Sequence, residues 1–196
     1  MKNSMKNEDH TAEIKGKGFR QKCFLGLLIL IVTAVLITFL TYQSNANKAG
    51  VADFQLTMYQ GSAITGNQPR FTELLESKQP LVLNFWAGLC PPCREEIPGL
   101  QKVYNDMGDD FLLVGIDIGP FVGLGSTEDA KKFLREFNIS YPTGVPTNAS
   151  LIQDYNVVGM PTTLFITAKG KIADRHTGYL AEEIARRKVS ELIGIK

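Results

Sequence analysis

The sequence predicts an α/β domain with a central mixed β-sheet flanked by helices, preceded by one N-terminal transmembrane helix. An uncharged apolar run near the N-terminus is long enough to cross a bilayer. Further on, two near-continuous apolar segments flank a helical pattern, which is typical of strands covered on both faces. A strand-helix-strand unit of this kind predicts two parallel strands. The chain ends with a hairpin signal and an amphipathic helix, so we expect antiparallel strands in the same sheet.

Composition limits the class of protein. The chain has 196 residues, which suits about one domain besides the apolar run. Hydrophobic residues make up 44% of the chain, and this content excludes a disordered protein. Lys and Arg number 21 against 20 Asp and Glu, for a net charge of +1. A net charge so close to zero provides no electrostatic attraction for phosphate groups, and we therefore expect no nucleic-acid partner.

The apolar run CFLGLLILIVTAVLITFL begins at Cys23, and as a helix it would span about 27 Å, close to the hydrocarbon core of a bilayer. Residues 1–22 carry six Lys or Arg against three acids, so the positive-inside rule keeps them in the cytoplasm. We expect a basic cytoplasmic N-terminus over 1–22, a transmembrane anchor over 23–42, a linker over 43–52 and a domain over 53–196. That domain would lie on the extracytoplasmic side of the cytoplasmic membrane.

A cleaved signal peptide is the alternative interpretation of this segment. Ser44, Asn45 and Ala46 resemble a small-x-small cleavage site. The apolar run is long for a signal peptide, whose apolar stretch is usually about 7–15 residues, and this length favours an anchor that is kept.

In the first half of the domain we expect a strand over 53–59, a turn over 61–66 and a short helix over 71–77. A buried strand over 80–86, a long helix over 91–106 and a second buried strand over 111–118 follow. Alternation of apolar and polar residues predicts the first strand. The sequences PLVLNFW and FLLVGIDI are continuously apolar, which predicts the two buried strands.

In the second half we expect a helix over 127–137 and a short helix over 149–155. Two strands over 162–167 and 171–177 and a last helix over 181–193 follow. Ser126 with Asp129 predicts the start of the first helix, because both side chains can cap it. The residues Ala168, Lys169 and Gly170 between the two strands are a hairpin signal.

Cys90 and Cys93 are the only cysteines after the apolar run, between a buried strand and a helix start. A thiolate at a helix N-terminus feels unpaired N–H groups and the helix dipole, which lower its pKa. Two cysteines three residues apart close almost no loop and add little stability. Zinc would need four ligands, and His176 is the only histidine in this part of the chain. The pair is therefore predicted to be a redox-active dithiol, with no metal and no other cofactor.

The sequence FWAGLCPPCREEIP resembles the thioredoxin superfamily, specifically the membrane-anchored thiol-disulfide oxidoreductases of the TlpA/ResA type. The segment GMPTTLF at 159–165 is similar to the part in which thioredoxins hold a cis-proline facing the dithiol. The resemblance covers residues 53–193 and implies a thioredoxin-like fold.

The resemblance also implies roles for individual residues. Cys90 would be the exposed nucleophile that forms a mixed disulfide with the target, and Cys93 the buried thiol that resolves it. Pro161, in the cis form, would shape the substrate groove, while the backbone of Met160 pairs with an extended target segment. Trp86 would lie beside the dithiol, either as a substrate contact or as an ordinary core aromatic.

A departure from ordinary thioredoxin points to Glu96. Thioredoxin carries a buried aspartate two residues before its tryptophan, and Asn84 stands at that place here. The anchored reductases resemble this chain in having a glutamate three residues after the second cysteine. At that spacing Glu96 shares a helix face with Cys93, and burial would raise its pKa toward neutrality for proton transfer. The alternative is a solvated acid, like Glu95.

Pro91 and Pro92 are expected to tune the redox potential. Neither has an N–H to give to the Cys90 thiolate, so the reduced form is less favoured and the pair is more reducing. We expect a potential nearer thioredoxin, about −270 mV, than DsbA, about −120 mV.

The function that we expect is a protein-disulfide reductase acting on exported proteins, such as apocytochrome c. The resemblance implies a membrane electron donor of the CcdA/DsbD type that recharges it. A disulfide oxidase or isomerase is the first alternative. A non-catalytic binding module is the second, and the retained Cys90, Cys93, Glu96 and Pro161 argue against it because such a module needs none of them.

Overall fold

The computed structural model describes residues 30–38 and 52–195. Residues 30–38, inside the apolar run, are helical. Within the described ranges every helix is too short or too polar to cross a membrane. The basic segment predicted at 1–22, and most of the predicted anchor and linker, lie outside the described residues.

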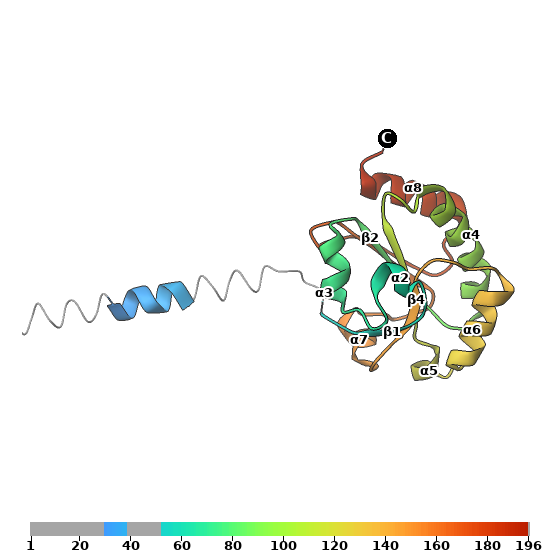
Figure 1. Ribbon diagram of the computed structural model, residues 1–196, viewed down its shortest axis with the longest axis horizontal. Coiled ribbons are helices and arrows are strands. Elements are labelled where there is room, and N and C mark those ends of the chain that lie inside the picture. The colour runs from blue at the N-terminus through green and yellow to red at the C-terminus, as the bar shows by residue number, and fades with distance from the viewer. Residues whose placement is uncertain (1–29, 39–51, 196) are drawn as a thin grey trace, which may run out of the picture. The chain divides into compact units, whose positions relative to one another are not determined.

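A mixed sheet of six strands forms the centre of residues 52–195 (Figure 1). The strand order is β1-β4-β3-β2-β5-β6. β2, β3 and β4 run parallel, whereas β1, β5 and β6 are antiparallel to their neighbours. The strands are β1 Leu56–Gln60, β2 Leu81–Trp86, β3 Leu112–Asp117, β4 Thr143–Pro146, β5 Thr162–Ile166 and β6 Ile172–Thr177. The predicted α/β class with a mixed sheet is confirmed.

Helices cover both faces of the sheet (Figure 1). One core cluster joins the sheet to α4 Pro91–Met107, α6 Thr127–Glu136 and α8 Glu182–Ile193. The cluster on the opposite face includes residues of α3 Phe71–Leu74 and α7 Ser150–Asp154. The remaining short helices are α2 Ser62–Thr65, η1 Leu75–Ser77 and α5 Gly119–Val122. Residues of β2 and β3 alternate between the two clusters, so both strands are buried on both sides, as their continuous apolar sequences predict.

Two local expectations differ from the structure. Residues 61–66, expected as a turn, contain the single helical turn α2. No strand is expected before residue 162 in the second half, yet β4 pairs with both β3 and β1. β4 has the sequence TGVP, too short for alternation to show, and three of its four residues are buried. Pairing with two neighbouring strands, rather than local propensity, therefore defines it.

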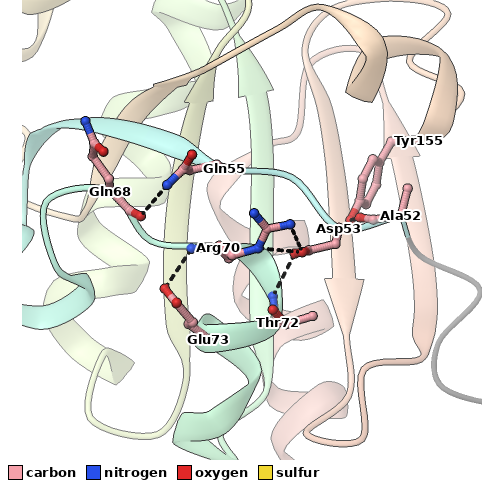
Figure 2. A network of polar contacts seen from close by, with 8 residues as sticks. All are labelled: Ala52, Asp53, Gln55, Gln68, Arg70, Thr72, Glu73 and Tyr155. Atoms are coloured by element: carbon pink, nitrogen blue, oxygen red, sulfur yellow. Dashed lines mark hydrogen bonds and ion pairs between the residues drawn. The ribbon is translucent and has the colours of Figure 1, made fainter. Parts of the chain in front are cut away.

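A network of polar contacts fixes the chain at the start of the folded domain (Figure 2). The Arg70 guanidinium forms an ion pair with Asp53, whose other oxygen accepts the Thr72 N–H at 3.2 Å. The Arg70 N–H donates to Glu73 at 2.9 Å, which caps α3. The Tyr155 hydroxyl donates to the carbonyl oxygen of residue 52 at 2.6 Å. Residues 52 and 53 are thus tied to α3 and to the end of α7.

Candidate active site

Cys90 and Cys93 form a disulfide at the start of α4, with Cα atoms 5.3 Å apart. Cys90 is the N-cap residue of the helix, and Cys93 lies in its first turn. Cys93 is fully buried, as expected. Cys90 is only 3% exposed, which differs from the exposed nucleophile that we expected. This burial belongs to the disulfide form, and the exposure of the reduced Cys90 thiol stays a prediction.

The two prolines occupy the first two positions of α4. The first helical residue with an N–H is therefore Cys93, and the N-terminus of α4 has lost two of the donors that could face the Cys90 sulfur. The Cys90 carbonyl accepts the Arg94 N–H at 3.1 Å, so the first backbone hydrogen bond of the helix forms despite the two prolines. Pro91 and Pro92 thus occupy the positions that the predicted tuning of the redox potential requires.

The Met160–Pro161 peptide bond is cis, as the resemblance implies. Phe85, next to the last residue of β2, pairs with Thr162, the first residue of β5. Pro161 therefore lies at the end of the sheet from which the chain continues to Cys90. Pro161 is buried, and its carbonyl accepts the Gly178 N–H at 2.8 Å. Met160 is half-buried and packs against both core clusters.

Trp86 does not face a substrate in this structure. It is the last residue of β2, is 0% exposed, and packs against Phe133 of α6 with ring centroids 5.5 Å apart. Trp86 is therefore a core aromatic in this structure, and its contact with substrate stays a prediction. The physical reason is that the α4–α6 side of β2 is covered along its whole length.

Glu96 is buried behind the dithiol, one turn after Cys93, and is 1% exposed. Its Oε1 accepts from Asn84 Nδ2 at 2.6 Å, and its Oε2 accepts from the Leu180 N–H at 2.7 Å. Burial raises the pKa of Glu96 to about 7, although the two hydrogen bonds act in the opposite direction. The alternative of a solvated helix acid is excluded by this burial. A carboxyl group that titrates near neutrality can take up a proton and release it.

A second buried carboxyl group was missed by sequence reasoning. Asp117 ends β3, pairs in register with Trp86 and is 0% exposed. Its oxygens accept from the Tyr59 hydroxyl and the Gly119 N–H, both at 2.9 Å. Burial raises the pKa of Asp117 to about 6. The available signal was an acid inside an otherwise apolar strand, at the carboxyl end of the sheet where sites gather.

The loop that follows Asp117 reaches the dithiol. The Leu89 N–H donates to the Leu124 carbonyl at 3.0 Å, which holds this loop beside the residue that precedes Cys90. Phe121, Val122 and Leu124 keep more than a third of their surface exposed, and Leu89 is 54% exposed. Apolar side chains thus border the active-site end of the sheet.

Within the described residues, no three His, Cys, Asp or Glu side chains gather as a metal site would require.

Comparison with known proteins agrees with this geometry. The sequence model of the Redoxin family matches residues 53–193. The chain belongs to the Redoxin family. Its resemblance to the ResA/TlpA type within the thioredoxin superfamily is also borne out by relatives. The Redoxin domain holds every residue of the candidate site described above.

Two relatives place the chain among similar proteins. It is 26% identical to the thiol-disulfide oxidoreductase ResA of Halalkalibacterium halodurans over 175 residues, which are 84% of this chain and 92% of that protein. It is 31% identical to the thioredoxin-like protein YneN of Bacillus subtilis over 112 residues, which are 56% of this chain and 62% of YneN.

Among solved structures, a DsbE-type thiol:disulfide interchange protein of Chlorobium tepidum matches with a TM-score of 0.63 at 22% identity. The match covers 75% of this chain and 97% of that one. At this identity the likeness concerns the fold, and it supports a thioredoxin-like arrangement for the Redoxin domain.

Proposed function

We propose that this protein is a membrane-anchored thiol-disulfide oxidoreductase that reduces disulfides in exported proteins. The observation that carries the proposal is the Cys90–Cys93 disulfide at the start of α4 with the buried Glu96 one turn behind it. This arrangement supplies a pair of sulfurs that can open and close, and a group that can hold the proton released in between. Relatives named as thiol-disulfide oxidoreductases support the same reaction.

The reaction starts from the reduced dithiol. The Cys90 thiolate attacks one sulfur of the target disulfide, which releases one target thiolate and forms a mixed disulfide. The Cys93 thiol then gives its proton to the Glu96 carboxylate and attacks the Cys90 sulfur. The second target thiolate leaves, the Cys90–Cys93 disulfide is restored, and two electrons have passed to the target. A membrane electron donor of the CcdA/DsbD type would return two electrons to the pair, and the proton held by Glu96 would go back to Cys93.

The direction of electron flow follows from the helix start. Because Pro91 and Pro92 remove two N–H donors, the Cys90 thiolate has less stabilisation than it would at an ordinary helix N-terminus. A less stabilised thiolate makes the reduced pair a better electron donor. We therefore propose a potential nearer that of thioredoxin, about −270 mV, than that of DsbA, about −120 mV.

The site of action is proposed from the N-terminal sequence. The uncharged apolar run and its basic flank favour an anchor in the cytoplasmic membrane, with the N-terminus in the cytoplasm and the Redoxin domain outside. Apocytochrome c, whose haem-binding cysteine pair must be reduced, is the proposed target, as the resemblance to the ResA type suggests.

Trapping of mixed disulfides tests this function. In Cys93→Ser the resolving thiol is lost, so targets attacked by Cys90 should stay attached and be released only by a reductant. Non-reducing electrophoresis and mass spectrometry should find exported proteins, with apocytochrome c among them. Cys90→Ser is the matched control and should trap none.

The potential of the purified pair decides the direction. Equilibration of the full-length protein with glutathione should give a value closer to −270 mV than to −120 mV. A potential near −120 mV would contradict the reductase and favour the oxidase.

A further inference from the structure

Two buried side-chain amides in this domain are held in different ways. Gln101 uses both ends: its Oε1 accepts the Ser140 N–H at 2.7 Å and its Nε2 donates to the Ser140 hydroxyl at 2.9 Å. Asn84 uses only its nitrogen, which donates to Glu96 Oε1 at 2.6 Å and to Thr163 Oγ1 at 3.0 Å. Its Oδ1 is buried and has no hydrogen-bond partner among the described residues.

The partners determine which amide can turn. A backbone N–H can only donate, so the bond from Ser140 fixes the orientation of Gln101. The partners of Asn84 have no such restriction. The Thr163 hydroxyl can donate as well as accept, and the Glu96 carboxyl group becomes a donor when it is protonated. Both hydrogen bonds of Asn84 can therefore be reversed together.

The place of the proton on Glu96 is restricted by the other side of the pocket. Oε2 accepts from the Leu180 N–H at 2.7 Å, and that group cannot become an acceptor. A proton taken up by Glu96 is therefore placed on Oε1, the oxygen that faces Asn84. The acid O–H and the Asn84 N–H would then point at each other. This arrangement sets two donors against each other, which is costly.

We propose that the Asn84 amide turns by half a rotation each time Glu96 gains or loses a proton. With Glu96 ionised, Nδ2 donates to the carboxylate and to Thr163, as the structure shows. With Glu96 protonated, Oδ1 accepts from the acid O–H and from the Thr163 hydroxyl, and the NH₂ group takes the place that Oδ1 holds in the ionised state. Asn84 is thus a positioning residue for proton transfer at the dithiol, and this inference rests on the role proposed above for Glu96.

The surroundings explain why an amide suits this position. The titratable neighbours of Glu96 are Cys93, one turn earlier on α4, and Tyr141, ahead of β4, whose pKa burial raises. β2 and β5 present Asn84 and Thr163, which do not titrate. An aspartate in place of Asn84 would add a second negative charge beside Glu96 and make it harder to keep ionised. An apolar residue would serve neither protonation state.

Side-chain NMR of isotopically labelled full-length protein tests the rotation directly. Nuclear Overhauser contacts between the Asn84 amide protons and the Thr163 methyl group would be followed from pH 5 to pH 9, beside the Glu96 carboxyl carbon. We expect the contact pattern to change with the same midpoint as the carboxyl titration. The Gln101 amide, locked at both ends, is the internal control and should not change. An Asn84 amide with constant contacts across the Glu96 titration would overturn the proposal.

Glu96→Gln separates a rotation from a simple effect of charge. In this variant the introduced side-chain carbonyl would accept the Leu180 N–H, so the introduced NH₂ group would face Asn84 and require the Asn84 oxygen. Asn84 should then show the low-pH contact pattern at every pH. The pattern of the ionised wild type in this variant would count against the inference.

Asn84→Leu gives a second readout that a merely structural residue would not affect. The Glu96 carboxylate would lose a charge-assisted hydrogen bond, which raises its pKa by about one to two pH units. The acid limb of the pH–rate profile should move up by the same amount, and an unmoved limb would contradict the inference. If Glu96→Gln turns over at the wild-type rate while the amide of the wild type rotates with the titration of Glu96, the rotation stands and the proposed role of Glu96 fails.

Discussion

Glu96 and Asp117 lie in two pockets on the same side of the sheet, and both have lost almost all contact with solvent. Burial raises both pKa values, to about 7 for Glu96 and to about 6 for Asp117. Their partners differ in kind. Asp117 is held by a phenol and a backbone N–H, which donate to it as fixed groups. Glu96 has one fixed backbone donor and one amide that can offer either end.

Because both carboxyl groups have a raised pKa, the shift does not by itself assign a role to either of them. Asp117 and Glu96 resemble each other in burial and in the direction of the pKa shift, yet only Glu96 lies one helical turn from a cysteine of the dithiol. Position along α4 and the character of the hydrogen-bond partners separate the two roles. Asp117 is best understood as a fixed acceptor that ties β1 and the start of α5 to the end of β3.

The largest expected effect is on stability, where the two groups should behave alike. Their folded-state pKa values lie above the unfolded ones, so the folded protein binds more protons, and its stability falls as pH rises from about 4 to about 7. Between pH 5 and pH 8 each group should lower the free energy of unfolding by about 1–3 kcal/mol, and Glu96 should contribute the larger share at the higher pH.

Urea unfolding of the oxidised wild type, Glu96→Gln and Asp117→Asn at the two pH values would measure these contributions. Each variant should lose its own part of the pH dependence. Equal pH dependence in all three proteins would show that the carboxyls do not carry it.

Turnover should separate the two groups. Glu96→Gln keeps the shape of the side chain but cannot accept a proton, and we expect disulfide reduction to slow by about 10- to 100-fold. The loss of rate below about pH 7, where wild-type Glu96 becomes protonated, should disappear as well. Asp117→Asn should stay within about twofold of the wild type because Asp117 takes no part in the exchange. Steady-state reduction of a model disulfide from pH 6 to pH 9 measures both, and similar losses in the two variants would abolish the distinction.

The smallest expected effect concerns the fixed donor in the Asp117 pocket. Tyr59→Phe removes a hydrogen bond that stabilises the ionised carboxyl group, so the pKa of Asp117 should rise by about one pH unit above its value of about 6. Carbon-13 NMR of the Asp117 carboxyl group would follow the titration. Glu96 serves as the control and should keep its midpoint, whereas a joint shift of both groups would mean that the pockets are coupled.

The sequence predicted the parts whose structure follows from local pattern. The continuous apolar strands β2 and β3 were predicted, and the C-x-x-C motif marked the start of α4. The cis bond at Pro161 was inferred from the family resemblance and is confirmed. β4 was not predicted, because four residues with a glycine and a proline carry no periodic signal.

In the site, the sequence left open whether Trp86 contacts substrate or belongs to the core, because covering by α6 is a tertiary effect. The hydrogen-bond partners of Glu96 and Asn84 also could not be predicted from the sequence. Thr163 and Leu180 lie on β5 and before α8, and only the sheet order brings them to Asn84 and Glu96. Hydrogen-bond partners far apart in the sequence leave no trace in local propensity.

The polar network around Asp53 and Arg70 has a mechanical consequence (Figure 2). A pull on the chain ahead of residue 52 meets the ion pair and the Tyr155 hydrogen bond before it can reach β1. Such a force is passed on to α3 and the end of α7, on the sheet face opposite the dithiol. A pull on the start of the domain is therefore taken up by elements on the opposite face of the sheet from Cys90, Cys93 and Glu96.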